Sequence, residues 1–470
     1  MATAIEGRSV VVLGLARQGT ALARWLVEQG ARVTVSDVQP ADRLRPAIES
    51  LRDLPLHYEM GGHPLTLLDG CDLLCLSGGV PIDAPIVVEA RRRDIALSND
   101  AQLFVERCPA AVIGITGSAG KTTTTALVGA MGQSAGRTTW VGGNIGKPLI
   151  GDLVEMTARD LVVMELSSFQ LEVMTVSPPV AAVLNVTPNH LDRHQSMAAY
   201  IAAKVRILDY QLLAPRPAGS APDVAVLGYD DPVARSLIGR AKGRLALFGR
   251  NGVGDWGYLA HARVEDGRVV LVKPEQTPGV APICEIRDIR LRGDHNVLNV
   301  LAACTLADAA GVSPQAMRDA IAAFAGVEHR LQFVREHHGV QYYDDSIATA
   351  PERVIAALGA FQEPIVLLVG GRDKHLPWEE AAQLIVKRVR QLIVFGEMVG
   401  LVQRSIADVT WRDSLESVHQ VETLTEAVQK AAEVARPGDV VLLSPGGASF
   451  DAFKDFAERG DKFQECVRAL

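Results

Sequence analysis

Short apolar runs alternate with amphipathic segments from residue 9 onward, and this alternation constrains the fold of the chain more than any other feature. Such an order is typical of parallel β-sheets that are covered by helices on both faces. At 470 residues the chain is too long for one ordinary hydrophobic core. The sequence therefore predicts an α/β protein of several domains, each built around its own sheet.

The alternation falls into three blocks, which predict three domains over residues 1–98, 99–326 and 327–470. The first and third blocks are expected to be Rossmann-like. The first block has expected strands at Ser9–Gly14, Arg32–Asp37, Cys71–Leu76 and Asp94–Leu97, and an expected helix at Thr20–Gln29. The third has expected strands at Val340–Tyr343, Ile365–Val369, Leu392–Phe395 and Val440–Leu442, and an expected helix at Leu424–Val434.

The second block has a less regular pattern. Its expected strands are Ala111–Thr116, Leu161–Leu166 and Val180–Val186, and a helix is expected at Asn296–Ala310. Residues 212–222 and 252–279 are rich in Gly and Pro, and they indicate a small antiparallel excursion on the same domain. Three such blocks in series suggest a site that is assembled between domains and closed by hinge motion.

Composition narrows the class of protein. Hydrophobic residues make up 48% and charged residues 22% of the chain, which is ordinary globular usage. A net charge of −8 argues against a nucleic-acid-binding protein. The six cysteines form no CxxC pair, and neither a signal-peptide pattern nor a run of membrane-spanning length is visible. We expect a cytoplasmic protein with reduced thiols and no membrane partner.

A glycine-rich loop follows the expected strand Ala111–Thr116 and precedes a helix, as in a central P-loop ATPase-like sheet. Its residues are Gly117, Ser118, Ala119, Gly120, Lys121, Thr122 and Thr123. Its glycines let backbone N–H groups converge on phosphate oxygens, Lys121 supplies a cation, and Thr122 offers a hydroxyl to Mg²⁺. The general pattern has one more glycine, where this chain has Ile115. The alternative is a glycine turn with a surface lysine.

Polar side chains follow the neighbouring strands of this block. Glu165 ends one expected strand, His190 comes shortly after another, and Asn144 lies in a glycine turn. The carboxyl ends of parallel strands meet at one edge of a sheet, so these groups are expected to converge there, with Glu165 placed for Mg²⁺. Each alone could be a capping or structural residue. Lys204 lies among small residues on an expected helix, and composition alone predicts a solvated side chain.

These residues belong to longer motifs that resemble the Mur ligases. The motifs are Gly117–Thr123, Gly142–Gly146, Glu165–Leu171, Asn185–Arg193, Gly293–Asn299, Glu328–Arg330, Asp344–Ser346 and Leu442–Pro445. The resemblance covers nearly the whole chain. Within the family, Glu165–Glu172, the Asn144 turn and Ala448–Phe456 are most similar to members that join D-glutamate to UDP-N-acetylmuramoyl-L-alanine.

The resemblance implies an ATP-dependent amide-forming ligase of peptidoglycan precursor synthesis. ATP would phosphorylate the substrate carboxylate, and the amine of the acceptor would attack the acyl phosphate. The residues implied in catalysis are Lys121, Asn144, His190 and Lys204. Those implied in ATP binding are the loop Gly117–Thr123 with Asn296, Asn299, Arg330 and Asp345. Two Mg²⁺ ions are implied, held by Thr122, Glu165, His190 and a carbamylated Lys204.

The resemblance also implies the binding residues for the two other substrates. Those for the UDP-sugar peptide are Leu15, Arg17, Gln18, Asp37, Gly79, Asn144, Ser167 and Gln170. Those for the amino acid are Thr349, Lys374, Ser449, Phe450 and Phe456. Many family members have a lysine where this chain has Ile347, and an Ala-Cys pair where it has Gly446-Gly447. The handedness of the glutamate therefore stays open, and we expect a monomer.

Three alternatives are open to test. A related ligase could use another acceptor such as L-glutamate, or act on a folate, although folate ligases usually begin at the ATP domain. A NAD-dependent dehydrogenase is suggested by the first strand-turn-helix and Asp37, but residues 14–19 lack the middle glycine of a dinucleotide loop. A non-catalytic nucleotide switch would not need Arg330, Asp345 and Lys374.

Overall fold

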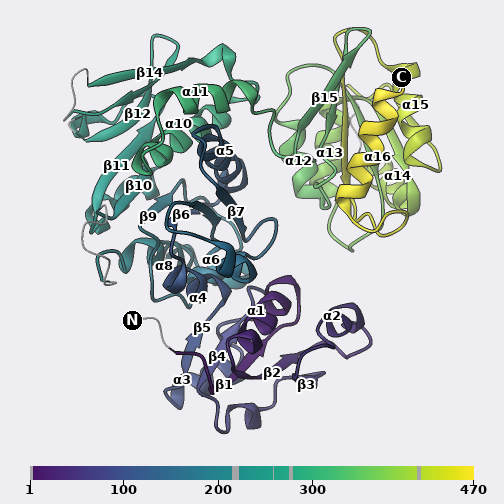
Figure 1. The fold of residues 1–470 in the computed structure, drawn as a ribbon. Helices are drawn as coiled ribbons and strands as arrows, with labels where there is room; N and C mark the ends of the chain where they lie inside the picture. The colour runs from purple at the N-terminus through teal and green to yellow at the C-terminus, as the bar shows by residue number, and fades with distance from the viewer. Residues whose placement is uncertain (1–3, 214–221, 258, 275–278, 410–413) are drawn as a thin grey trace. The chain divides into compact units, whose positions relative to one another are not determined.

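The computed structural model describes residues 4–213, 222–257, 259–274, 279–409 and 414–470. The chain divides into two compact units (Figure 1). The larger comprises residues 1–289 and 294–324, and the smaller comprises residues 290–293 and 325–470. The larger unit carries two separate sheets and the smaller carries one, which confirms the predicted α/β class with three domains. The boundaries predicted at residues 98/99 and 326/327 stay predictions.

The first sheet has five parallel strands in the order β3-β2-β1-β4-β5. The strands are β1 (Ser9–Leu13), β2 (Arg32–Asp37), β3 (His57–Met60), β4 (Leu73–Leu76) and β5 (Ala96–Ser98). The helices are α1 (Arg17–Glu28), α2 (Arg45–Ser50), α3 (Pro85–Arg92) and α4 (Asp100–Arg107). This doubly covered parallel sheet is the Rossmann-like arrangement expected from the sequence, with β3 as a strand that was not predicted.

The central sheet has nine strands in the order β14-β13-β12-β11-β10-β9-β6-β8-β7. They are β6 (Ala111–Thr116), β7 (Thr139–Gly143), β8 (Leu161–Glu165), β9 (Val180–Val183), β10 (Val224–Gly228), β11 (Arg244–Gly249), β12 (Ala260–Glu265), β13 (Arg268–Val272) and β14 (Val280–Glu285). The helices are α5 (Lys121–Ser134), α6 (Ser168–Leu171), α7 (Leu191–His194), α8 (Met197–Asp209), α9 (Pro232–Ser236), α10 (Asp294–Ala309) and α11 (Pro314–Ala323).

The antiparallel excursion consists of β12, β13 and β14, which pair antiparallel at one edge of this sheet. Most of its expected first part, residues 214–221, lies outside the described part of the chain, and the described residues 212, 213 and 222 form no strand. Instead β10 and β11 continue the parallel sheet between β9 and β12.

Alternation of side chains along the central strands buries both faces of the sheet. Ile113 and Ile115 of β6 pack into a core with α5, α10 and α11, whereas Val112 belongs to the core on the other face. Residues of α8 such as Ile207 and Leu208 lie in that second core. Because both faces are covered, the functional groups of this sheet are carried on the loops at its strand ends.

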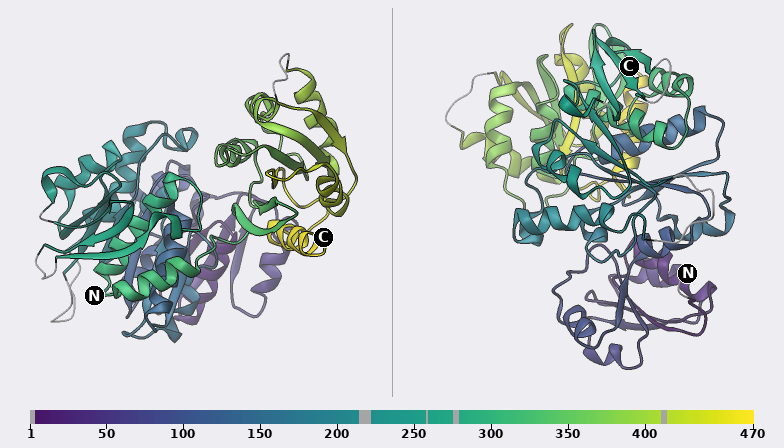
Figure 2. Two further views of the ribbon diagram at one scale, coloured as in Figure 1. Left: turned by 90° about the horizontal axis from the view of Figure 1, so that it is seen from above. Right: turned by 90° about the vertical axis from the view of Figure 1, so that its left-hand side faces the viewer.

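The third sheet has six strands in the order β15-β16-β20-β17-β18-β19, all parallel except β15. Helices flank this sheet on both faces (Figures 1 and 2). They are β15 (Gln332–His337), β16 (Val340–Asp344), β17 (Ile365–Gly370), β18 (Val389–Phe395), β19 (Ser417–Gln420) and β20 (Val440–Gly446). The helices are α12 (Pro351–Leu358), α13 (Glu379–Arg388), α14 (Val399–Ala407), α15 (Leu424–Val434) and α16 (Phe456–Arg468). One core packs against α12, α13 and α14, and the other against α15 and α16.

Among the described residues, no helix combines the length and the apolar character that crossing a membrane would require.

Candidate active site

The phosphate loop runs from the end of β6 to the start of α5. Gly120 caps the helix in the left-handed conformation, with φ of 82°. A Cβ at this position would collide with Oδ1 of Asn299. Both facts require glycine here. The N-terminus of α5, where the N–H groups of the first turn and the helix dipole favour an anion, therefore opens directly on the loop.

The loop is braced by the segment that follows β9. The backbone N–H of Ser118 donates to the Asn185 carbonyl (3.0 Å), and that of Ala119 donates to Asn185 Oδ1 (2.8 Å). Ser118 Oγ donates to the Thr187 carbonyl (2.9 Å) and lies 3.0 Å from the hydroxyl of Tyr200. The loop is thus pre-organised by protein contacts.

Lys121 folds back over the loop. Its Nζ donates to the carbonyl of Gly117 (2.8 Å) and approaches that of Ser118 (3.3 Å). The ammonium therefore lies at the loop, where it can neutralise phosphate charge.

Thr122, Asn144 and Glu165 come together at the strand ends. The Thr122 hydroxyl donates to Glu165 Oε2 (2.9 Å), and Asn144 Nδ2 donates to Glu165 Oε1 (2.8 Å). Glu165 is only 2% exposed. The three residues come from α5, the turn after β7 and the end of β8, so these three groups meet at one edge of the sheet. This arrangement brings a carboxylate and a hydroxyl, the hard oxygen ligands that Mg²⁺ prefers, beside a phosphate-binding loop.

Within the described part of the chain, no group of three or more His, Cys, Asp or Glu side chains is placed to hold a metal ion. Mg²⁺ usually keeps several waters and binds through one or two carboxylates together with substrate phosphates. Glu165 and Thr122 are the residues that could hold it here.

Lys204 is buried at 1% exposure, so the solvated side chain expected from composition was wrong. It lies on α8 with its Nζ donating to the Gly117 carbonyl (2.8 Å) and 4.6 Å from the centre of the Tyr200 ring. Burial and the nearby charge of Lys121 together lower the pKa of Lys204 to about 7, although the Glu165 carboxylate acts against this. A large fraction of the amine is therefore neutral near pH 7.

His190 is exposed and has a positive φ of 53°. Its ring contacts Phe169 with 5.2 Å between centroids. Phe169 also stacks on the ring of His194, with 5.1 Å between centroids. Nε2 of His194 lies 2.9 Å from Ser168 Oγ. The segment carrying His190 is therefore packed against the turn that follows Glu165.

Ser167 and Gln170 form a capping box at the start of α6. The N–H of Gln170 donates to Ser167 Oγ (3.1 Å), and the N–H of Ser167 donates to Gln170 Oε1 (3.1 Å). The Asn99 side chain donates to the Gln170 carbonyl (2.8 Å). These contacts fix the backbone after β8.

Two predicted ATP-binding residues lie on α10. The Asn299 amide donates to Asn296 Oδ1 (2.9 Å), and its own Oδ1 accepts a weaker bond from Thr124 (3.5 Å). This places Asn299 against the first turn of α5, directly behind the phosphate loop.

Five of the predicted UDP-sugar residues lie at or shortly after the carboxyl ends of β1, β2 and β4, namely Leu15, Arg17, Gln18, Asp37 and Gly79. The Asp37 carboxylate accepts from the N–H of Leu15 (2.7 Å) and of Gln39 (2.8 Å), so it holds the first turn. Gln18 Oε1 accepts a longer bond from Gly78 N–H (3.3 Å), next to Gly79. Arg17 donates to the Asn144 carbonyl (3.2 Å) and thereby contacts the turn after β7.

The smaller unit carries Arg330 and Asp345. Asp345 is buried, and its carboxylate accepts from Ser444 Oγ (3.0 Å) and from Leu331 N–H (3.2 Å). Burial raises the pKa of Asp345 to about 7, although its hydrogen bonds and Arg330 act against this.

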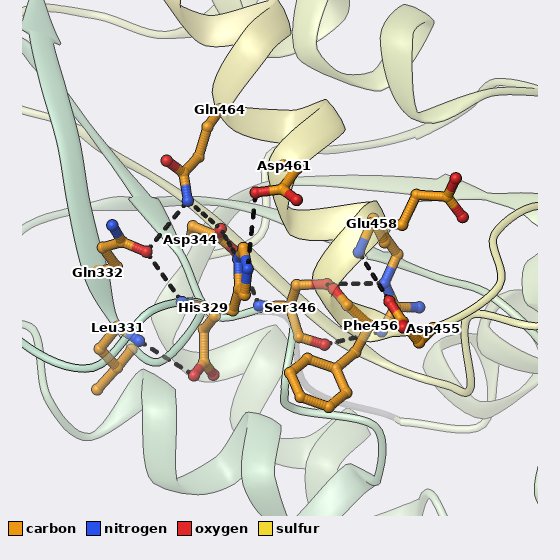
Figure 3. A network of polar contacts seen from close by, with 12 residues as sticks. His329, Leu331, Gln332, Asp344, Ser346, Asp455, Phe456, Glu458, Asp461 and Gln464 are labelled. Carbon is orange, nitrogen blue, oxygen red and sulfur yellow. Dashed lines mark hydrogen bonds and ion pairs between the residues drawn. The ribbon is translucent and has the colours of Figure 1, made fainter. Parts of the chain in front are cut away.

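The residues next to Arg330 and Asp345 form a buried network (Figure 3). His329 Nδ1 lies 2.8 Å from Asp344 Oδ2, which also accepts from Gln464 (2.9 Å). Burial alone would lower the pKa of His329, but the Asp344 hydrogen bond and charge outweigh it and raise the pKa. The pair anchors both segments that bear the predicted ATP contacts to α16.

The predicted acceptor residues lie on loops of the same unit. Lys374 Nζ donates to Thr349 Oγ1 (2.9 Å), and burial lowers the pKa of Lys374. Ser449 is buried, whereas Phe450 is 63% exposed and Phe456 is 37% exposed. The structure thus brings the lysine and threonine together and leaves two aromatic rings open to a ligand.

Sequence reasoning missed Asn185 and Tyr200, which brace the phosphate loop. The signal for Tyr200 was its position four residues before Lys204, which puts both on one face of α8.

Family models match in three places along the chain. Residues 8–98 match "Mur ligase MurD-like, N-terminal domain", residues 115–307 match "Mur ligase middle domain", and residues 329–447 match "Mur ligase, glutamate ligase domain". The chain belongs to the Mur ligase family, the ATP-dependent ligases that form amide bonds.

Relatives that match over nearly their full length carry the name of one particular enzyme of this family. The chain is 38% identical over 469 residues to the UDP-N-acetylmuramoylalanine--D-glutamate ligase of Acetivibrio thermocellus, covering 99% of this chain and 97% of the relative. It is 41% identical over 466 residues to the enzyme of that name from Symbiobacterium thermophilum, covering 99% of each.

Solved structures of other family members share the fold. UDP-N-acetylmuramate-alanine ligase of Thermotoga maritima has a TM-score of 0.54 at 20% identity, covering 98% of this chain and 99% of that one. MurF of Acinetobacter baumannii has a TM-score of 0.56 at 17% identity, covering 99% and 93%.

Proposed function

We propose that this protein catalyses the ATP-dependent addition of D-glutamate to UDP-N-acetylmuramoyl-L-alanine in peptidoglycan precursor synthesis. The observation that carries the proposal is that relatives 36–41% identical over nearly their whole length bear the name of this D-glutamate ligase. The phosphate loop beside Glu165 is the chemical feature that such a reaction needs.

The reaction proceeds through an acyl phosphate. An oxygen of the substrate's terminal carboxylate attacks the γ-phosphorus of ATP, and ADP leaves. The amine of glutamate then attacks the acyl carbon, and the tetrahedral intermediate expels phosphate to leave the amide. Lys121 and the N–H groups of the phosphate loop hold the phosphoryl oxygens, and Asn144 holds an oxygen of the reacting group.

Thr122 and Glu165 are the proposed protein ligands of Mg²⁺, and His190 is the proposed contact for a second ion. Bound Mg²⁺ would neutralise the negative charge that develops on the phosphoryl group. Asn296, Asn299, Arg330 and Asp345 are proposed to bind ATP.

Lys204 is proposed to be carbamylated. Only a neutral amine adds CO₂, and the lowered pKa of Lys204, about 7, supports a sizeable neutral fraction near neutral pH. The product is a carboxylate-like anion, which removes the unfavourable approach of two ammonium groups, Lys204 and Lys121.

The UDP-sugar peptide is proposed to bind at the turns around Leu15, Asp37 and Gly79, with Ser167 and Gln170 at the end of β8. Glutamate is proposed to bind near Thr349, Lys374, Ser449, Phe450 and Phe456. The residue ranges 1–98, 99–326 and 327–470 are proposed as the domains. The expected cytoplasmic location and monomeric state stay predictions.

The test is incubation of the protein with ATP, Mg²⁺, UDP-N-acetylmuramoyl-L-alanine and each amino acid separately, with phosphate release and product mass measured. Turnover with D-glutamate is expected. Turnover only with L-glutamate would correct the acceptor, and turnover with neither enantiomer would reject the assignment.

A further inference from the structure

The smaller unit buries one arginine completely. Arg459, on α16, is 0% exposed and has the largest fully buried side chain among the described residues. Burial lowers the pKa of Arg459 to about 10, so the guanidinium is still charged at neutral pH. A buried charge is unfavourable unless its donors are satisfied, so its partners show what its position serves.

Those partners are two strand-end loops. Arg459 Nε donates to Ser346 Oγ (3.0 Å) and Nη2 donates to the Ser346 carbonyl (2.9 Å). The third guanidinium nitrogen, Nη1, donates to the Gly447 carbonyl (3.1 Å). The guanidinium fork therefore ties the loop after β16 to the loop after β20.

The same contacts reach the start of α16. Ser346 Oγ donates to the Phe456 carbonyl (2.7 Å), and the labelled Ser346 and Phe456 lie side by side in Figure 3. A Cβ on Gly371 would lie 2.9 Å from Arg459 Nη1, so the loop after β17 also passes close to the guanidinium.

Each of these segments carries proposed acceptor-site residues. Thr349 follows Ser346, Lys374 follows Gly371, and Ser449 follows Gly447. Phe456 itself begins α16. Arg459 thus hydrogen-bonds to the segments that bear Thr349 and Ser449 and lies close to the one that bears Lys374, although its own side chain is sealed from solvent.

The loop after β20 is held from its other side by packing. Trp378 and Met398 are both buried. A Cβ on Gly446 would lie 2.5 Å from the Trp378 ring, and one on Gly447 would collide with the Met398 sulfur. The glycine pair is therefore matched to these two side chains.

We propose that Arg459 is the positioning residue of the amino-acid acceptor site, an inference that rests on the proposed function. The planar guanidinium group of Arg459 fixes the separation of the loops that bear Thr349 and Ser449. The side chains of Trp378 and Met398 pack against the second of these loops. Binding residues must be held within a fraction of an ångström by such supporting hydrogen bonds.

The experiment compares Arg459→Lys and Ser346→Ala with wild type. Lysine keeps the charge but cannot donate in the planar fork, and alanine removes only the hydroxyl between Arg459 and Phe456. The matched control is Arg468→Lys, the same change at an exposed position of the same helix. KM is measured separately for the amino acid, ATP and the UDP-sugar peptide, and melting curves establish which variants are folded.

We expect KM for the amino acid to rise about tenfold or more in both variants, with the other two KM values within about twofold of wild type. A loss of kcat alone, or an equal rise in all three KM values, would overturn the positioning role. Ser346→Ala keeps the guanidinium in place, so it decides the question even if Arg459→Lys does not fold.

The amino acid used is the one that wild type turns over. Failure of wild type to use glutamate would therefore count against the proposed function. If wild type turns over an amino acid but the KM for that amino acid is unchanged in both variants, the result would count against Arg459 as the positioning residue.

Discussion

The buried ammonium of Lys204 donates to the carbonyl of Gly117, the first residue of the phosphate loop, at 2.8 Å. The helix α8 is thereby connected to the loop that is proposed to hold ATP. A neutral or carbamylated Lys204 would change the charge at the loop.

Lys204→Ala is expected to lower turnover by about 10²-fold or more, because it removes the proposed anion from the metal site. A small carboxylate such as formate in the buffer should restore part of the activity, since it can occupy the vacated space. Steady-state rates with and without formate measure this. The control is the exposed Lys242→Ala, and full activity of Lys204→Ala without formate would reduce the lysine to a structural role.

Lys121→Ala is expected to lower kcat by about 10²-fold or more, since a positioned charge stabiliser of the phosphoryl group is lost. The loop backbone should remain, because Ser118 and Ala119 are held by Asn185. Single-turnover phosphate release measures the effect. Rates close to those of Lys242→Ala would remove Lys121 from the chemistry.

Glu165→Gln is expected to raise the Mg²⁺ concentration needed for half-maximal rate by about tenfold or more, as is found when groups at a metal site are altered. Glutamine keeps the size of the side chain but loses the charge that faces Thr122 and Asn144. Magnesium titrations of the rate provide the measurement, with exposed Glu155→Gln as the control. An unchanged Mg²⁺ requirement would exclude Glu165 as a ligand.

Asp345 should make the stability of the smaller unit pH-dependent. Its folded pKa, about 7, lies above that of an unfolded aspartate, about 3.9. Between these values folding takes up a proton, so the free energy of unfolding falls as pH rises and is constant above about pH 7.

Relative to Asp345→Asn, wild type should therefore lose about 2 to 3 kcal/mol of unfolding free energy between about pH 5 and pH 8. Denaturant unfolding at the two pH values measures this difference, with exposed Asp408→Asn as the control. A difference between wild type and Asp345→Asn that does not change with pH would show that Asp345 titrates normally.

The strands that sequence predicted are those whose side chains are buried along most of their length, such as β6, β8, β17 and β20. The edge strands β3, β15 and β19 were missed because they are only partly buried and show no apolar run. β10 was missed for a different reason. Val224–Gly228 is a buried apolar run, but it follows the Gly- and Pro-rich residues 212–222, whose composition indicated an antiparallel excursion rather than a further parallel strand.

The site was predictable where parallel strands end together, because topology alone brings Glu165, Asn144 and the phosphate loop to one edge. Lys204 was not predictable from composition, since small residues around a lysine are compatible with either a buried or a solvated helix face. Arg459 gave no signal in sequence, because its function depends on which loops surround α16 in three dimensions.

The most direct test of the central claim, that ATP activates a carboxylate, is oxygen transfer. The terminal carboxylate of UDP-N-acetylmuramoyl-L-alanine is labelled with ¹⁸O, and the phosphate released during turnover with D-glutamate is analysed by mass spectrometry. An acyl phosphate intermediate predicts that each phosphate carries one labelled oxygen from the substrate, while the other stays in the amide. Phosphate that carries oxygen from water, with no label from the substrate, would contradict it.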